Sequence, residues 1–145
     1  MSIEEVRVLI CDDSVFARKK LKDFLISVGI KEVFEATDGI EAIKAYKDNS
    51  PTVVFMDIIM PKKSGIEDLQ EIIDFDKKAK VVMASSVGTQ NHLKDSINAG
   101  ACEFLQKPIE NDYVLKIINN IIKEAFTLVF YCLLSFCNLF ICVDI

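Results

Sequence analysis

The chain has 145 residues, 51% of them hydrophobic, which suits one globular domain and excludes a disordered chain. Its 22 acidic residues outnumber the 17 basic ones, and the net charge of −5 argues against a nucleic-acid-binding surface. The five cysteines show no metal-ligand spacing, and the single histidine, His92, excludes a His-rich metal site and a Ser/His/Asp triad. We expect a reducing, cytoplasmic setting with no secretory signal before the first apolar run.

Short apolar, β-branched runs alternate with helical patterns along most of the chain. The runs predicted to form strands are 6–10, 32–35, 53–56, 81–84 and 103–105. Gly29 and Gly100 are predicted to stop the first and fourth helices. The second and third helices are predicted to open with the capping-box pairs Asp38/Glu41 and Ser64/Glu67.

Apolar residues at helical spacing mark the predicted helices. They are Val15, Leu21, Leu25 and Val28 in the first helix, Leu93 and Ile97 in the fourth, and Val114, Leu115, Ile118, Ile121 and Ile122 in the fifth. Strands that alternate with helices predict an α/β fold, a doubly wound five-stranded parallel sheet with helices on both faces. We expect one (βα)₅ domain over residues 1–124, followed by an apolar tail over residues 125–145.

Polar side chains follow four of the five predicted strands: Asp12 and Asp13 after the first, Asp57 after the third, Ser85 after the fourth and Lys107 after the fifth. Ligands of parallel α/β sheets bind at this carboxyl edge. Three neighbouring carboxylates repel one another, so either one stays protonated or a cation is present, and an oxygen-only set suits Mg²⁺. Asp57 can then act as a nucleophile and form an aspartyl phosphate, with Lys107 and Ser85 contacting the phosphoryl oxygens.

Several motifs of the chain match one family. They are the segments 8–14 (Val-Leu-Ile-Cys-Asp-Asp-Ser), 36–42 (Ala-Thr-Asp-Gly-Ile-Glu-Ala), 56–61 (Met-Asp-Ile-Ile-Met-Pro), 99–101 (Ala-Gly-Ala) and 104–108 (Phe-Leu-Gln-Lys-Pro), together with Ser85. With these motifs the chain resembles bacterial two-component response regulator receiver domains over about residues 5–122, and within them the CheY-like chemotaxis regulators. The resemblance implies the flavodoxin-like receiver fold.

The resemblance also implies a role for each site residue. Asp57 matches the phosphoacceptor, and Asp12 and Asp13 match the acidic pair that holds Mg²⁺, with Asp13 as the direct ligand. The backbone carbonyl of Ile59 matches a further metal ligand. Lys107 matches the lysine that contacts the phosphoryl group.

Two further positions match the family's switch: the Ser85 hydroxyl, which moves toward the phosphoryl group, and Phe104, an aromatic side chain that turns inward on activation. Two more, Ile59 and Val87, match sites that tune the lifetime of the phosphoryl group. Both are apolar and cannot orient an attacking water. We therefore expect slow loss of the phosphate in the absence of a phosphatase partner.

The resemblance implies partners rather than a small substrate. The expected phosphodonor is a phosphohistidine on a separate histidine kinase, since His92 lies in the fourth helical pattern, away from the strand ends. The expected output is binding of a protein such as a flagellar motor switch component, through residues 89–99 and 104–110. The protein is expected to catalyse only its own phosphorylation and dephosphorylation, and to bind no nucleic acid.

Two rival functions use related folds. A phosphatase of the haloacid-dehalogenase type requires a second aspartate two residues after the nucleophile, where this chain has Ile59. A flavodoxin-like carrier requires a hydroxyl- and glycine-rich loop after the first strand, where Asp12 and Asp13 would repel a phosphate. Both rivals are disfavoured.

The tail carries no charged residue over the 19 positions 125–143. That length suits a membrane-spanning helix, and Lys116 and Lys123 before it would keep the domain cytoplasmic. The tail is alternatively a packed or oligomeric helix. A third interpretation is a non-native extension read past the end of an AT-rich frame, since family members usually stop near residue 122.

Overall fold

The computed structural model describes the backbone of residues 1–60 and 64–141, and the side chains of these residues up to Ser135. Pro61, the last residue of one family motif, lies outside the described residues, as do residues 142–145 of the tail.

A five-stranded parallel sheet in the order β2-β1-β3-β4-β5 forms the centre of the molecule. Its strands are β1 (Arg7–Cys11), β2 (Glu32–Ala36), β3 (Val53–Asp57), β4 (Val81–Ser85) and β5 (Glu103–Gln106). The helices between and after them are α1 (Val15–Ser27), α2 (Gly39–Asn49), α3 (Gly65–Phe75), α4 (Gln90–Asn98) and α5 (Asn111–Ile141), and a 3₁₀ turn, Ile3–Glu5, precedes β1. This confirms the predicted doubly wound five-stranded α/β fold.

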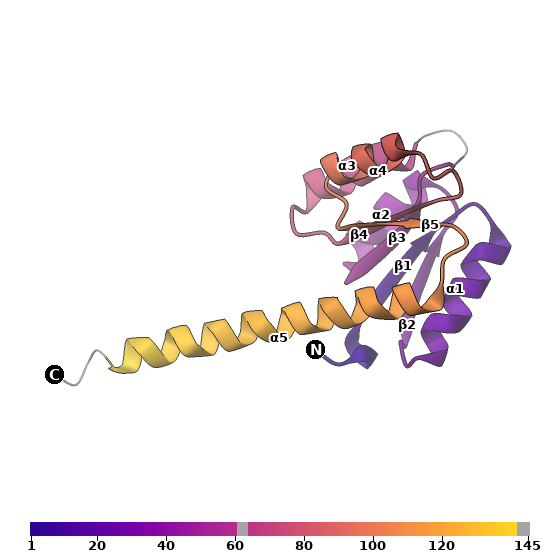
Figure 1. Ribbon diagram of the computed structural model, residues 1–145. Coiled ribbons are helices and arrows are strands. Elements are labelled where there is room, and N and C mark those ends of the chain that lie inside the picture. The colour runs from indigo at the N-terminus through magenta and orange to yellow at the C-terminus, as the bar shows by residue number, and fades with distance from the viewer. Residues whose placement is uncertain (61–63, 142–145) are drawn as a thin grey trace.

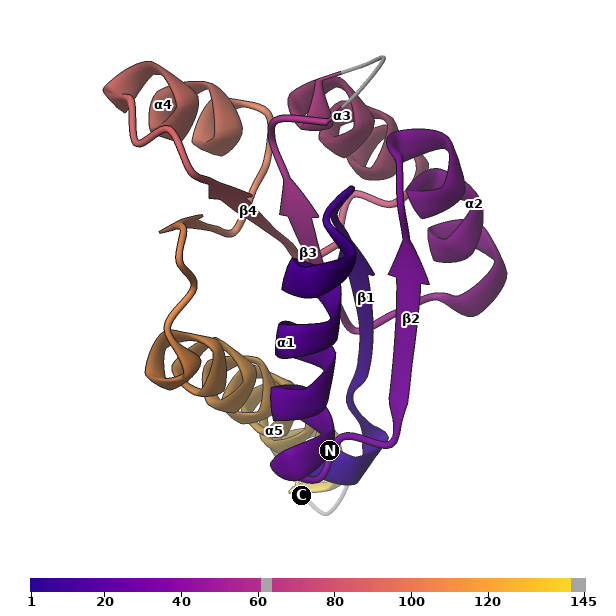
Figure 2. The same ribbon diagram turned by 90° about the vertical axis from the view of Figure 1, so that its right-hand side faces the viewer.

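Each face of the sheet carries its own buried core. Alternate strand residues point to opposite faces, so Leu9 packs with side chains of α2 and α3, whereas Ile10 packs with side chains of α1 and α5. Figure 2 shows α2 and α3 on the opposite side of the strands from α5. The central strands β3 and β4 are buried along their whole length, as their unbroken apolar sequences predict.

The helices α1, α2 and α4 begin or end where the capping residues and glycines predict, but the predicted capping-box hydrogen bonds of α2 are only partly formed. Gly29 and Gly100 follow α1 and α4 with φ values of +110° and +107°, a conformation that favours glycine. Asp38 caps α2 through the amide of Glu41 at 2.9 Å, but the Glu41 carboxylate accepts from Thr37 and does not complete a capping box.

Three of the apolar residues that mark the predicted helices are exposed. Val15 is 69% exposed, because it begins α1 beyond the edge of the sheet. Leu93 and Ile97 of α4 are about half exposed, and it is Ser96 that this helix buries. Their spacing identified the helix correctly but not the face that it turns toward the sheet.

Helix α5 has two dissimilar parts. Val114, Ile118 and Ile121 are buried against the sheet, and Glu124 forms an ion pair with Lys80 at 2.6 Å. Beyond Glu124 the helix runs on past the sheet as the long yellow end in Figure 1. Within the described residues, Asn111–Ser135 is long and apolar enough to cross a membrane, with a mean hydropathy of 1.5 in its most apolar window.

Candidate functional site

The alternation of side chains along the strands brings three charged residues to the same face of the sheet, at its carboxyl edge. Asp12 is two residues beyond Ile10, Asp57 two beyond Phe55, and Lys107 two beyond Leu105. These three apolar residues belong to the same core, on the α1 and α5 side. Because side chains alternate along a strand, Asp12, Asp57 and Lys107 are directed to that same side, at the carboxyl edge where ligands bind.

The carboxylates of Asp12, Asp13 and Asp57 form a cluster in which one oxygen of each lies within 4.8 Å of the others. Asp12 and Asp57 are buried, and Asp13 is exposed. The set contains oxygen ligands only and keeps an open side, which fits Mg²⁺ with its several retained waters. The sequence prediction of these three residues as neighbours is therefore matched by the geometry.

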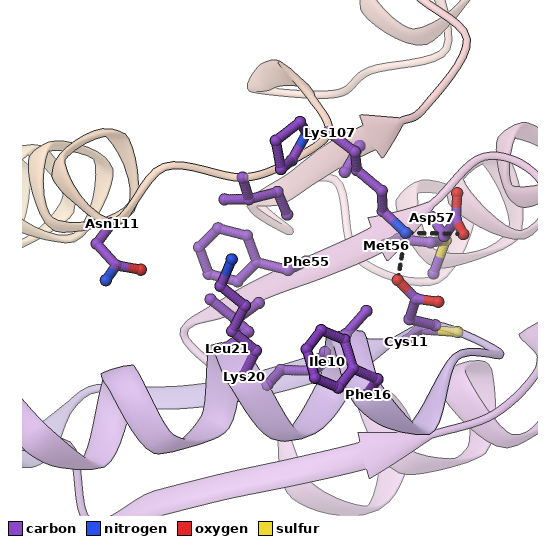
Figure 3. Close-up of a pocket in the computed structure, with 15 residues that line it drawn as sticks. Ile10, Cys11, Phe16, Lys20, Leu21, Phe55, Met56, Asp57, Lys107 and Asn111 are labelled. Carbon is purple, nitrogen blue, oxygen red and sulfur yellow. Dashed lines mark hydrogen bonds and ion pairs between the residues drawn. The ribbon is translucent and has the colours of Figure 1, made fainter.

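Lys107 partly neutralises this cluster. Its ammonium donates to Asp12 and, at 3.1 Å, to Asp57 Oδ2, as the dashed lines in Figure 3 show. Burial alone would lower the pKa of Lys107, but the hydrogen bonds and charges of the two carboxylates outweigh it and raise the pKa. The side chain thus remains a fixed positive charge beside Asp57.

Asp57 is held by both carboxylate oxygens. Oδ1 accepts from the backbone amide of Ile59 at 3.1 Å, and Oδ2 accepts from Lys107. Burial raises the pKa of Asp57 above its usual value, against the lowering effect of Lys107. A cavity of about 200 Å³, lined by Asp57, Lys107 and apolar residues of α1 and β3, lies next to this carboxylate (Figure 3).

Gly65 is a site residue that the sequence reasoning missed. A side chain at this position would place its Cβ 2.1 Å from the backbone oxygen of Asp57, so α3 can begin here only with glycine. The Gly65 amide also donates to the carbonyl of Ile58 at 2.9 Å. This contact fixes the backbone around Asp57. In the sequence, the only local indication that position 65 requires glycine was the Ser-Gly pair before a helical pattern.

The other predicted site residues surround this centre. Ser85 is the last residue of β4 and fully buried, and its hydroxyl exchanges hydrogen bonds with the backbone of Val87 rather than with Asp57. Phe104 of β5 packs on the α2 and α3 core and lines a second surface hollow next to α5. Ile59 and Val87 are 48% and 47% exposed.

The family comparison identifies the chain. Residues 8–119 match the response regulator receiver domain family. The chain belongs to this family. Similar proteins include the chemotaxis protein CheY of Bacillus subtilis (strain 168), 44% identical over 113 residues, which cover 78% of this chain and 94% of that protein. CheY of Thermotoga maritima is 40% identical over 117 residues, which cover 81% of this chain and 98% of that protein.

Solved structures agree with this assignment. A chain of the crystal structure of the CheX–CheY–BeF₃–Mg²⁺ complex from Borrelia burgdorferi is 38% identical, with a TM-score of 0.74, and the match covers 83% of this chain and 89% of that one. A receiver domain protein from Clostridium thermocellum is 29% identical with a TM-score of 0.78, and the match covers 85% and 98% of the two chains. This receiver domain is thus CheY-like.

The assignment decides between the functions considered from the sequence. Receiver domains are signal transducers, so the phosphatase and flavodoxin-like carrier alternatives are not supported. Receiver domains also bind Mg²⁺ in an acidic pocket, and the Asp12, Asp13 and Asp57 cluster provides one here. The family match ends at residue 119, before the apolar part of α5.

Proposed function

We propose that this receiver accepts a phosphoryl group from a histidine kinase onto Asp57 in an Mg²⁺-dependent reaction, and so switches a protein-binding surface in chemotaxis-type signalling. The observation that carries the proposal is the convergence of three carboxylates within 4.8 Å of one another, with Lys107 hydrogen-bonded to Asp57. The CheY names of the similar proteins support the chemotaxis setting.

In the transfer step, a carboxylate oxygen of Asp57 attacks the phosphorus of a phosphohistidine. The new O–P bond forms as the P–N bond breaks, and the imidazole nitrogen leaves with the electron pair and takes up a proton. Bound Mg²⁺ supplies charge neutralisation for the phosphoryl oxygens. Asp12 and Asp13 would hold it, together with Asp57 and the backbone carbonyl of Ile59.

Lys107 prepares Asp57 for this step and remains useful after it. Before transfer, its ammonium lowers the pKa of Asp57 against the raising effect of burial, and so favours the ionised carboxylate, which is the nucleophile. After transfer, Asp57 carries a group of charge near −2, and Lys107 is within reach to pair with one of its oxygens. The receiver therefore supplies nucleophile and positive charge itself and catalyses its own phosphorylation.

Ser85 connects the phosphoryl group to α4. Its hydroxyl donates to the Val87 carbonyl at 3.2 Å and accepts from the Val87 amide at 3.1 Å. The same carbonyl accepts from the amide of Thr89, the N-cap of α4. If the hydroxyl turns to a phosphoryl oxygen, Val87 loses both bonds, and the start of α4 must rearrange. The output surface would then comprise residues 89–99 and 104–110, with Phe104 adjusting beside it.

Loading the site with beryllofluoride and Mg²⁺ tests this switch. We expect amide NMR shifts throughout α4 (Gln90–Asn98) and residues 104–110, because the Ser85 to Val87 bonds are exchanged for bonds to the fluoride atoms. The Ser85→Ala variant should retain shifts near Asp57 but lose most of those in α4. Shifts limited to the surroundings of Asp57 in the unmodified protein would contradict two-state switching.

The proposed partners are a histidine kinase as phosphodonor, a downstream protein such as a motor switch component, and a phosphatase. The solved complex of a similar CheY with CheX, beryllofluoride and Mg²⁺ supports binding of a further protein to the loaded receiver.

Ile59 is expected to lengthen the lifetime of the aspartyl phosphate. Its side chain is apolar and half exposed directly after the acceptor segment, so it offers an attacking water no hydrogen bond. We expect the Ile59→Asn variant to lose phosphate several-fold faster than the unmodified protein, measured as self-dephosphorylation after removal of the donor. Ile26→Asn, at a similarly exposed isoleucine at the far end of α1, is the control. A half-life of a few seconds in the unmodified protein would contradict slow loss.

We further propose that the chain divides into a cytoplasmic receiver, residues 1–124, and a tail, residues 125–145, that anchors it in a membrane. The ion pair of Glu124 with Lys80 is the outermost described tie between α5 and the sheet. Residues 125–141 of the helix span about 25 Å at 1.5 Å per residue, close to the thickness of a bilayer core.

The distribution of apolar side chains favours a membrane over a second copy of the chain. From 126 to 134, seven of nine residues are large and apolar, and these are 49–70% exposed. Consecutive apolar residues cover every side of a helix, whereas a dimer needs one apolar stripe. In the most apolar window of α5 only 11% of the residues are buried, so this is not the core helix of a soluble domain.

Cell fractionation tests the anchor. We expect the full chain to stay with membranes after alkaline carbonate washing, and a chain ending at Glu124 to be soluble. Leu133→Lys, in the middle of the helical segment 125–141, should release a large fraction of the protein, because a central lysine costs about 3 kcal/mol on insertion. Ile26→Lys on α1 is the matched control. A full-length protein found wholly in the soluble fraction would contradict the anchor.

A further inference from the structure

Arg18 on α1 is a buried basic side chain to which neither the motifs nor the proposed transfer step assigns a role. Among the described residues it is the one lysine or arginine that is buried, with 8% of its surface exposed. Burial of a guanidinium is unfavourable unless its donors are engaged, so its contacts indicate what it does.

The guanidinium joins the loop after β1 to the neighbouring strand β2. Its Nη1 donates to the backbone carbonyl of Asp12 at 2.6 Å, and its Nε lies 3.4 Å from Glu35 Oε1. The other oxygen of Glu35 accepts from Lys22 at 3.0 Å. Glu35 pairs with Ile10 in the sheet, so Arg18 is anchored on the rigid part of the fold while it holds the loop.

The carbonyl that Arg18 holds belongs to the peptide between two carboxylates of the site. The other groups of Asp12 are also engaged, because its amide donates to the Ala36 carbonyl at 3.1 Å and its Oδ1 accepts from the Ser14 amide at 2.9 Å. Asp13 is exposed, and the direction of its side chain depends on the plane of that peptide. Arg18 sets this plane from the buried side.

We propose that Arg18 is a positioning residue for the metal site, which aims Asp13 at the cluster by fixing the peptide that joins it to Asp12. This inference rests on the proposed Mg²⁺ site. It predicts a change of Mg²⁺ affinity opposite to the change expected from charge alone. Removal of a positive charge near three carboxylates would by electrostatics alone strengthen Mg²⁺ binding, whereas loss of positioning weakens it.

Mg²⁺ dissociation constants of the unphosphorylated protein, measured by isothermal titration calorimetry, separate these effects. We expect about 10-fold weaker binding for Arg18→Ala, the size typical of groups that orient metal ligands. Arg18→Lys should recover part of the affinity, since an ammonium can reach the Asp12 carbonyl but lacks the fork that also engages Glu35. Amide shifts of Asp13 without metal should change in Arg18→Ala.

Lys22→Ala is the matched control, because it removes a positive charge and a Glu35 contact from the same helix without touching Asp12. We expect its Mg²⁺ affinity to be unchanged or slightly higher. Unchanged or tighter Mg²⁺ binding in Arg18→Ala would overturn the proposal, as would equal weakening in Lys22→Ala.

If Arg18→Ala does not fold, Arg18→Lys and Glu35→Gln replace it, and an unchanged Mg²⁺ affinity in both variants would overturn the proposal. An unmodified protein that binds no Mg²⁺ would instead refute the metal site itself.

Discussion

Asp57→Asn is expected to reduce phosphoryl incorporation to background in the presence of Mg²⁺ and a phosphorylated kinase. The amide that replaces the carboxylate is not a nucleophile, and its single oxygen can accept from either the Ile59 amide or Lys107, so one of the two contacts is kept. Radiolabel transfer followed on gels measures the effect. The variant should remain folded, because it removes a buried charge from a cluster of like charges.

Asp23→Asn is the control for this substitution, because Asp23 is an exposed carboxylate of α1 that pairs with Lys19. It should label like the unmodified protein. Labelling of Asp57→Asn at an undiminished level would move the acceptor to another residue, with Asp12 and Asp13 the nearest carboxylates.

Lys107→Ala is expected to change metal binding and stability in opposite directions. Without the ammonium that contacts Asp12 and Asp57, the three carboxylates repel one another more strongly, so Mg²⁺ should bind about tenfold more tightly. The metal-free protein should lose about 1–3 kcal/mol of unfolding free energy, less than for a fully buried pair because Lys107 is 20% exposed. Calorimetry and thermal unfolding in EDTA measure the two effects.

The pH dependence of the Lys107→Ala variant follows from Asp57. Burial raises the pKa of Asp57 in the folded protein, and loss of Lys107 removes a lowering influence. Between the unfolded and the raised folded pKa of Asp57, the folded state binds more protons, so the metal-free free energy of unfolding falls as pH rises and recovers on acidification.

Lys20→Ala, at another lysine of the same cavity, is the control for both measurements on Lys107→Ala. Unchanged Mg²⁺ affinity in Lys107→Ala would contradict the competition between ammonium and metal.

The strands were predictable because their signals are local. Each of the five lies within one residue of its predicted bounds, and each ends one residue later than predicted. Asp57 and Ser85 therefore close their strands instead of following them, which fixes their backbones by sheet hydrogen bonds. The prediction that Asp12, Asp13 and Asp57 converge needed only the strand ends and the parallel order of the fold.

Other parts of the site were beyond reach of the sequence because they depend on distant contacts. The role of Gly65 requires that the start of α3 pass against the backbone of Asp57. The role of Arg18 requires that Glu35 of β2 lie beside β1, which is a matter of strand order and register. The bonds of the Ser85 hydroxyl to Val87 depend on a side-chain rotation that no residue pattern encodes.

By itself the sequence determined the fold class, the strands to within one residue and the set of residues at the carboxyl edge. These features depend on the alternation of apolar runs and on the alternating direction of side chains along a strand, which involve only a few neighbouring residues. Only the tertiary structure decided which of these side chains contact one another at the carboxyl edge. Lys107 bridges Asp12 and Asp57 across 95 and 50 residues of chain, and such pairs form only after the sheet has set its order. The change of composition after Glu124 predicted the end of the domain, and the structure added that α5 continues across this point as one helix that no longer packs on the sheet.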